Sequence, residues 1–274
     1  MKRSHLATLS LTTTLGLAAC GGGSDADPPA PFTVALNNCT EYVGVTTVPS
    51  AGVLPLVAPT FTAVETAGTS VPIANRSTIF KIRTSRCEQA SIDGHAARHT
   101  TTVQVGVAAA VPAGYDVPGP GYSFQFAYIT DNPELFEAMQ RWGIAVEYDG
   151  SLSHAFTPID AASGIYAASV HSARLGHFTV GGTVTPPTAS SPQIVVPFLA
   201  EWSASAGSAV LSLRTDFPAI AIGSTPTAAL PTVTVTATPG SLLASWLGAN
   251  SAGFTVSSRF NSWASATMRA DQKR

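Results

Sequence analysis

The chain is poor in charge and in the motifs on which many enzyme classes depend. Only 11% of its 274 residues are charged, and lysine and arginine form no cluster, which argues against nucleic acid as a partner. The sequence contains no phosphate-binding loop, no dinucleotide fingerprint and no Gly-x-Ser-x-Gly motif. Lysine is scarce, because only Lys81 and Lys273 follow the first few residues. No motif therefore identifies a reaction.

Long hydrophobic runs are also missing, apart from a short one near the amino terminus. Residues 6–17 follow the basic pair Lys2 and Arg3, and they are too few and too rich in threonine to span a bilayer. A basic start, a short apolar run and small residues before a cleavage point are typical of a secretory signal peptide. The sequence predicts such a signal over residues 1–19.

The end of this leader, Leu17-Ala18-Ala19-Cys20, resembles the lipobox of bacterial lipoproteins. The resemblance implies cleavage before Cys20 and attachment of acyl chains such as palmitate to its thiol and its new amino group. Two or more chains anchor a protein stably to a membrane. The expected location is the bacterial cell envelope, lipid-anchored at the outer membrane and facing the periplasm. The alternative is a plain signal peptide that ends near a cysteine.

The composition beyond the leader indicates a short linker and one folded unit. Residues 20–31 begin with the acylated cysteine and continue as a polar, Gly/Pro-rich flexible tether. Residues 32–274 are rich in serine, threonine, alanine and glycine, and they are long enough for a single β-rich domain. A Pro/Ser-rich stretch at 186–192 is the candidate seam. Removal of Lys2 and Arg3 leaves a net charge of about −4.

Besides Cys20, the sequence contains two cysteines, Cys39 and Cys87. An even number of cysteines outside the cytoplasm predicts a disulfide, which the chain-entropy model values at about 4 kcal/mol for a loop of this length. The alternative is two buried free thiols. A zinc site is not expected, because no histidine–cysteine cluster accompanies the pair.

Alternating apolar and polar residues dominate the folded unit and predict about a dozen strands with one or two short helices. The fold class expected is mainly β (β-rich α+β), an antiparallel barrel or sandwich. One or two strands are expected over 32–36 and 41–48, another strand at 60–66, and a second short helix at 240–248.

The stretch 122–150 is the centre of the predicted fold. Its aromatic residues alternate over 122–128 and are expected on one face of a strand. Asp131 or Asn132 then caps a helix over 133–142, with Pro133 at its first position and Gly143 after its end. The aromatic face and the helix predict a ligand pocket, although core packing is the alternative for the helix residues. The expected lining is Tyr122, Phe124, Phe126, Tyr128, Met139 and Trp142.

Two passages of the chain resemble the acetoacetate decarboxylase-like fold. The first holds Val48-Pro49 and Leu54-Pro55, and the second runs from Tyr128 through Asp131-Asn132-Pro133-Glu134 into a helix. The resemblance covers about half the mature chain and implies a cone-shaped barrel with an apolar pocket. Enzymes of this family use a lysine just after that helix to form a Schiff base with a β-keto acid.

That lysine is missing here. The corresponding passage, 142–146, reads Trp-Gly-Ile-Ala-Val, and Lys81 lies in a different part of the chain. No catalytic residue is therefore carried over. A metal site from His154, His171 and Asp160 is conceivable, but the spacing matches no ligand motif, so neither a metal nor a cofactor is predicted.

Three functions remain as hypotheses. The first is an envelope-anchored lipoprotein whose β-barrel-like domain binds a small apolar ligand or an envelope partner. The second is an acetoacetate decarboxylase-like enzyme, a carbon–carbon lyase, that uses groups such as His154 or Glu147 inside the barrel in place of the family's lysine. The third is a structural β-sandwich without a pocket.

Overall fold

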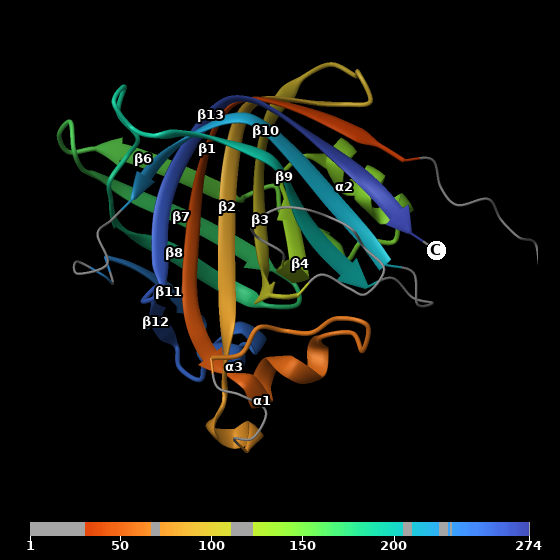
Figure 1. Cartoon of the computed structure of the whole chain (residues 1–274), viewed down its shortest axis with the longest axis vertical. Coiled ribbons are helices and arrows are strands. Elements are labelled where there is room, and N and C mark those ends of the chain that lie inside the picture. The colour runs from red at the N-terminus through yellow and green to blue at the C-terminus, as the bar shows by residue number, and fades with distance from the viewer. Residues whose placement is uncertain are drawn as a thin grey trace, which may run out of the picture.

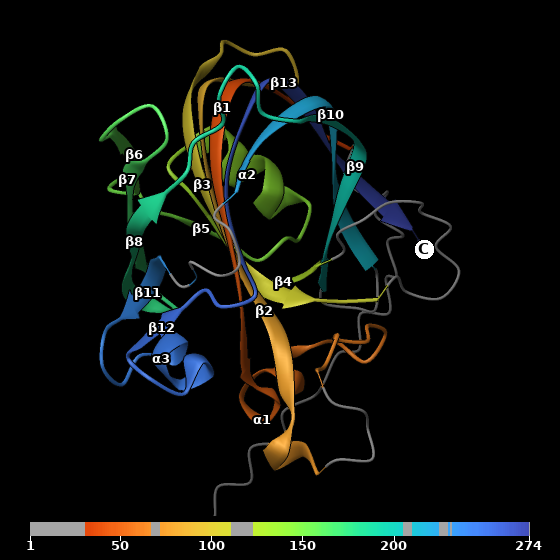
Figure 2. The same ribbon diagram turned by 60° about the vertical axis from the view of Figure 1, so that its left-hand side comes forward.

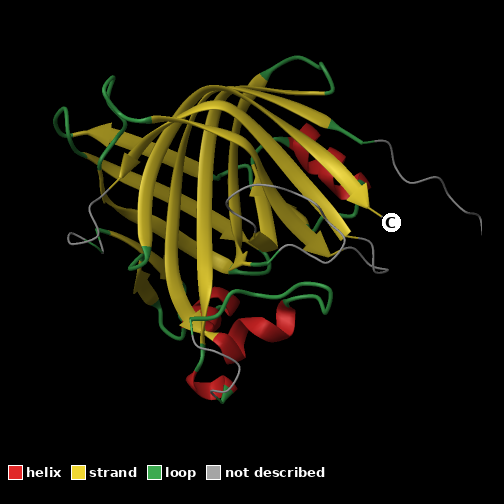
Figure 3. Ribbon diagram, viewed as in Figure 1, coloured by secondary structure: helices red, strands yellow, loops and turns green. Residues whose placement is uncertain are grey.

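The computed structural model describes residues 31–66, 72–110, 123–204, 210–224, 230 and 232–273. Strands make up most of this part of the chain, and the helices are few and short (Figure 1, Figure 3). The predicted mainly-β fold class is confirmed. Cys20, the tether up to residue 30 and Tyr122 lie outside the described residues. Within them, no helix is long and apolar enough to cross a membrane.

The strands form two sheets. The larger sheet consists of β1 (Thr33–Pro49), β2 (Ser77–Ile92), β3 (Arg98–Ala108), β4 (Ser123–Thr130), β5 (Val146–Tyr148), β9 (Gln193–Ala204), β10 (Val210–Ser224) and β13 (Ser257–Lys273). The smaller sheet consists of β6 (Ser153–Pro158), β7 (Gly164–Ser172), β8 (Gly176–Val184), β11 (Val233–Ala237) and β12 (Ser251–Gly253). The helices are α1 (Ser50–Val53), α2 (Pro133–Arg141) and α3 (Leu242–Leu247), with 3-10 turns η1 (Leu54–Leu56) and η2 (Ile73–Asn75).

The larger sheet closes on itself. Its strand order is β3-β2-β1-β13-β10-β9-β4-β5, and β3 also pairs with β4, so that seven strands form a ring with β5 beside it. The pairings are antiparallel except those of β4 with β5 and with β9. Figure 2 shows the strands curving around a common interior, in which α2 lies. This ring is the barrel of the fold.

The smaller sheet, in the order β12-β11-β8-β7-β6, covers part of the outer face of the barrel. A shared core joins the two sheets, with Tyr42 and Phe80 from the barrel and Tyr166 and Phe178 from the smaller sheet, all fully buried. The rings of Tyr42 and Tyr166 stack with centroids 4.7 Å apart. Residues 185–192 carry the chain from β8 to β9, from one sheet to the other. Whether a domain boundary lies there stays a prediction.

Helix α2 forms where the sequence predicts a helix. The Asn132 side chain accepts hydrogen bonds from the backbone N–H groups of Glu134 and Leu135, at 3.0 and 3.2 Å, and Pro133 occupies the first turn. Trp142 is the carboxyl-terminal cap, and Gly143 follows with φ 77°, a conformation that favours glycine. The buried face of α2 packs against inner-face residues of the barrel such as Val34 and Met268. The helix therefore closes one end of the barrel.

Strand β4 departs from the expected alternation. A β-bulge interrupts its register with β3, because Val105 pairs with Ala127 and the next residue, Gly106, pairs with Gln125. The extra residue, Phe126, shifts the pattern by one position. The prediction that all four rings share one face is wrong. Phe124 and Phe126 lie in the core between the sheets, whereas Tyr128 lies with α2 inside the barrel.

Two further strand boundaries can be compared with the prediction. The one or two strands expected over 32–36 and 41–48 are a single strand, β1, in which Asn38 adopts φ 51°. Asparagine tolerates this left-handed conformation better than most residues, so the strand continues through a local irregularity. The strand expected at 60–66 is limited to isolated bridges from Ala63 to Ala109 and from Glu65 to Thr78.

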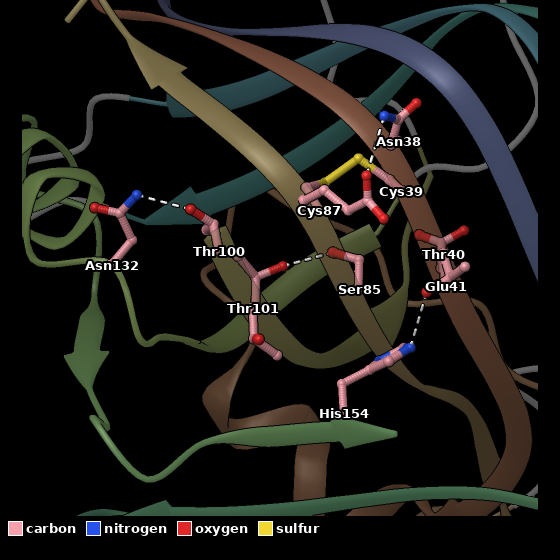
Figure 4. The surroundings of a disulfide bond; sticks show 12 residues. Asn38, Cys39, Thr40, Glu41, Ser85, Cys87, Thr100, Thr101, Asn132 and His154 are labelled. Atoms are coloured by element: carbon pink, nitrogen blue, oxygen red, sulfur yellow. Dashed lines mark hydrogen bonds between the residues drawn. A yellow bond between two sulfur atoms is a disulfide. The ribbon is translucent and has the colours of Figure 1, made fainter. Parts of the chain in front are cut away.

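The predicted disulfide is present. Cys39 on β1 and Cys87 on β2 are direct cross-strand partners, and their sulfur atoms are bonded at 2.06 Å (Figure 4). Both cysteines are almost completely buried. The bond lies inside the barrel, in a cluster with Phe217 and Trp263.

Candidate functional site

The middle of the barrel interior is polar. On β2, Phe80 and Ile82 face the core between the sheets, so the alternate residues Lys81, Arg83 and Ser85 face the inside of the barrel. Because direct cross-strand partners point to the same side of a sheet, each of these residues has interior neighbours on the adjacent strands. The register with β1 and β3 sets which groups meet there.

A buried ion pair occupies the centre of this interior. Arg83 Nε donates to Glu41 Oε1, and Asn261 Nδ2 donates to Glu41 Oε2 at 3.0 Å. Arg83 Nη1 contacts Gln104 Oε1 at 3.5 Å, and the guanidinium lies 5.8 Å from the centroid of the Phe217 ring. Glu41 is 3% exposed and Arg83 is 6% exposed. Four strands thus hold one carboxylate and one guanidinium away from bulk water.

Such a pair is poor evidence for stability. Burying two charges has a large desolvation cost, and apolar side chains of similar volume often stabilise a core as well or better. Charged groups in a water-excluded interior are, in contrast, characteristic of binding and catalytic sites. Glu41 and Arg83 therefore mark the interior of the barrel as the candidate site.

A small cavity adjoins the ion pair, on the side of the barrel that α2 closes. Its volume is about 20 Å³, which is enough for a single water-sized group. Its polar wall consists of Arg83, Ser85, Thr100, Thr102, Gln104 and Thr215. Its apolar wall consists of Leu36, Cys87, Tyr128, Leu135, Trp263 and Met268.

The opposite end of the interior is more accessible. Going from Glu41 along β1, the next inward-facing residues, Val43 and Val45, are half-buried, and Val45 is the cross-strand partner of Lys81. The Lys81 side chain is half-buried too, and its Nζ donates to Ser123 Oγ at 3.2 Å. Lys81 therefore lies inside the barrel, between the ion pair and solvent, although its place in the chain does not match that of the family's lysine.

The six predicted pocket residues are divided between two cores. Phe124 and Phe126 pack against Phe61 and Trp246, with ring centroids 4.8 and 5.1 Å apart, respectively. Met139 and Trp142 belong to the cluster around α2, and Tyr122 lies outside the described residues. Tyr128 lines the cavity of 20 Å³. An apolar pocket lined by the whole set stays a prediction.

The side chains expected to act inside the barrel lie elsewhere. Glu147 accepts hydrogen bonds from Ser172 Oγ and the Ala173 backbone, both at 2.8 Å, at the turn between β7 and β8. His154 is buried between the two sheets, with Nε2 3.3 Å from Thr40 Oγ1 (Figure 4). The expectation that these groups cluster in the interior is therefore wrong, because both belong to the contact between the sheets.

Burial, followed by the charges of Arg86 and His99, lowers the pKa of His154 to about 3. The imidazole is therefore neutral at physiological pH. His171 is exposed and stacks on His177, and Asp160 accepts the Ala162 N–H within a turn. The structure does not bring His154, His171 and Asp160 together as a metal site. No group of three metal-ligating side chains occurs in the described part of the chain.

The residues that do meet in the interior were missed by sequence reasoning. One signal was available on β2, where Lys81, Arg83 and Ser85 alternate with Phe80 and Ile82. That pattern indicates a strand with one polar face, and such a face is ordinarily assigned to solvent. The closure of the sheet turns it inward instead.

No family model matches the chain, and no curated protein matches it in sequence. Solved structures do match its fold. An acetoacetate decarboxylase-like enzyme from Sphingomonas wittichii RW1 has a TM-score of 0.53 and 10% identity, covering 89% of this chain and 93% of that one.

Two further structures agree. The enduracididine biosynthesis enzyme MppR, complexed with pyruvate, has a TM-score of 0.52 and 11% identity over 92% of this chain and 93% of its own. Acetoacetate decarboxylase from Legionella pneumophila has a TM-score of 0.50 and 10% identity over 95% of both chains. The chain therefore has an acetoacetate decarboxylase-like fold, as the sequence resemblance implied. At these identities the likeness concerns the fold alone.

Proposed function

We propose that this protein is an enzyme of acetoacetate decarboxylase-like fold, a carbon–carbon lyase that acts on a small oxo acid inside the barrel. The observation that carries the proposal is the buried pair of Glu41 and Arg83, held by Gln104 and Asn261 within a closed ring of strands. The pyruvate complex of MppR supports it, because a protein of the same fold binds an oxo acid.

Arg83 would provide the positive charge for the substrate carboxylate. A guanidinium in a water-excluded site attracts an anion more strongly than it would in water, because the surroundings screen the charge less. Glu41 and Asn261 fix the position of Arg83 and so determine where the carboxylate lies. Oxo acids are small, which suits an interior with little free volume beyond the ion pair.

Lys81 would supply the reactive amine that the passage after α2 lacks. It faces the same interior as Arg83, two positions along β2, at a separation of about 7 Å between backbones. The amine attacks the substrate carbonyl carbon, water leaves, and an iminium forms. When the substrate is a β-oxo acid, the bond from the neighbouring carbon to the carboxylate then breaks, carbon dioxide leaves, and the bonding electrons move towards the iminium nitrogen. The resulting enamine is protonated on carbon, and water then releases the ketone or aldehyde product.

Reductive trapping tests this function. We expect incubation with pyruvate or acetoacetate and cyanoborohydride to add the reduced ligand to Lys81, because the mature chain has only Lys81 and Lys273 as lysines. Peptide mass spectrometry distinguishes the two sites. Lys81→Arg should abolish the adduct, and Lys273→Arg should leave it unchanged. An adduct absent from Lys81, with no carbon dioxide released from acetoacetate or related oxo acids, would disprove the enzymatic proposal.

A binding role without chemistry would use the same interior. It agrees with the first sequence hypothesis, in which the domain binds a small ligand or an envelope partner. Tyr128 and Leu135 provide an apolar wall beside the ion pair. Saturable binding of a small acid with neither adduct nor carbon dioxide release would favour this function over catalysis.

We also propose that Cys20 is acylated and that residues 20–31 tether the domain to the bacterial envelope, on the periplasmic side of the outer membrane. The support is the leader sequence alone. Mass spectrometry of the mature amino terminus checks it directly. Cys20→Ser should move the protein from the membrane fraction to the soluble periplasmic fraction, and equal partition of the two proteins would contradict the anchor.

A further inference from the structure

Trp263 brings an unmatched hydrogen-bond donor to the interior of the barrel. It lies on β13, is 5% exposed, and its indole forms part of the cavity wall beside the ion pair. The ring packs edge to face on Phe217, with centroids 5.0 Å apart. Its Nε1 is buried and has no hydrogen-bond partner among the described residues. Indole N–H is a donor only, and it usually finds an acceptor when buried.

Asn261, two residues earlier on the same strand, brings an unmatched acceptor. Its Nδ2 donates to Glu41 Oε2 at 3.0 Å, which sets the orientation of the amide. The remaining atom, Oδ1, is buried and also has no partner in the described part of the chain. Residues two apart on a strand share a face, so a donor and an acceptor occupy successive inward positions of β13.

Unpaired buried polar atoms are rare in proteins, and each one requires an explanation such as a bound group. The cavity beside Trp263 has a volume of about 20 Å³, which suits a single oxygen atom with its hydrogen. A methyl group would also fit but would leave the indole N–H unpaired. A hydroxyl group in the cavity can accept a hydrogen bond from Trp263 Nε1, and its own proton can be donated to one of the polar groups of the cavity wall, such as the Thr215 hydroxyl.

We infer that this end of the barrel is a subsite for a hydroxyl group of the substrate. The inference rests on the proposed function and narrows the substrate to a small oxo acid with a hydroxyl group remote from its carboxylate. Arg83 and Trp263 both line the cavity, so it can take the hydroxyl group of an acid whose carboxylate lies on the guanidinium. A site that hydrogen-bonds a hydroxyl group discriminates strongly against the analogue that lacks it.

Two unreactive acids separate this subsite from the chemistry at Lys81. Neither 4-hydroxybutyrate nor butyrate has a carbonyl group that an amine can attack, so titration calorimetry measures their binding alone. We expect the unmodified protein to bind 4-hydroxybutyrate about tenfold more tightly than butyrate, the ratio that one net hydrogen bond provides.

The variant Trp263→Phe keeps an aromatic ring against Phe217 but removes the N–H. We expect it to bind butyrate as the unmodified protein does and to lose the preference for 4-hydroxybutyrate. Trp246→Phe is the matched control, because Trp246 is also buried but lies in the core between the sheets. It should keep the tenfold preference. Circular dichroism establishes that both variants are folded.

The outcomes distinguish the subsite from the proposed function. Equal affinity of the unmodified protein for the two acids would overturn the subsite, as would a preference that persists in Trp263→Phe. Either result leaves the proposed function intact if oxo acids still form an adduct with Lys81. Binding of neither acid, with no adduct, would overturn both.

Discussion

We expect Glu41 and Arg83 to contribute more to the proposed binding in the interior than to the stability of the fold. Both side chains are almost fully buried, and each has the other as its ion-pair partner. Removing one partner leaves the other as an uncompensated buried charge, whereas removing both removes the desolvation cost as well. Stability and binding should therefore respond differently to single and double substitutions.

We predict that Arg83→Met lowers the free energy of unfolding by about 3–5 kcal/mol, because it leaves the Glu41 carboxylate unpaired. The double variant Glu41→Met with Arg83→Met should recover most of this loss but bind no small acid. Urea denaturation followed by circular dichroism measures the first effect, and calorimetry measures the second. A double variant as unstable as the single one would show that the pair stabilises the barrel.

His154 makes the stability of the protein depend on pH. Its pKa is about 3 in the folded protein and about 6.5 in the unfolded chain. Between these values the unfolded chain binds a proton that the folded protein does not, so stability falls as the pH is lowered from about 6.5 towards 3. The full difference corresponds to about 5 kcal/mol at most.

The variant His154→Gln should lose this component and show a flatter decline of melting temperature between pH 7 and pH 4, as followed by calorimetry. His171→Gln is the control, because His171 is exposed. It should decline as the unmodified protein does. Identical pH profiles for His154→Gln and the unmodified protein would mean that folding does not lower the pKa of His154.

Among the elements, α2 could be predicted from the sequence and the bulge in β4 could not. The signals for α2 are local, because the capping Asn132, the first-turn Pro133 and the terminal Gly143 lie within a dozen residues. The bulge depends on a partner strand. Gly106 on β3 lies so close to β4 that an added Cβ would clash with the Phe124 carbonyl oxygen. The sequence of β4 alone does not indicate this close contact with β3.

The contribution of the α2 cap to stability can be tested by substitution. Asn132 caps the helix, and its Nδ2 donates to Thr100 Oγ1 on β3 at 2.7 Å. We expect Asn132→Ala to lower the free energy of unfolding by about 1–2 kcal/mol, since both the cap and this tie to the barrel are lost. Gln140→Ala, on the exposed side of α2, should change it by less than about 0.5 kcal/mol. Equal midpoints in urea would contradict the assignment.

For the whole molecule, the polar interior was beyond prediction because it is assembled from distant segments. Glu41, Arg83, Gln104 and Asn261 lie on four adjacent strands, and the strand order and register bring them together. Propensity and periodicity show which residues share a face of one strand, but not whether that face turns inward. The disulfide was easier to predict, because only two cysteines are present besides Cys20.

That disulfide connects β1 and β2 across a separation of 48 residues. We expect Cys39→Ala with Cys87→Ala to lower the free energy of unfolding by about 2–4 kcal/mol, mainly because the unfolded chain gains freedom. The native circular dichroism spectrum should persist, since the same strands are paired by backbone hydrogen bonds. Unfolding in urea with and without a reductant measures the loss. Unchanged midpoints would contradict the expectation.

The ring of strands is not equally strong all the way round. Pairing between β1 and β2 runs along almost their full length, whereas β4 meets β9 in the described residues only through Ser123 with Glu201 and Phe124 with Trp202. Thermal fluctuations should separate β4 from β9 before they separate other strand pairs. Amide protons of β4 and β9 should therefore exchange with deuterium sooner than those of β1 and β2. A fold that shields charge from water thus retains a place where water can enter.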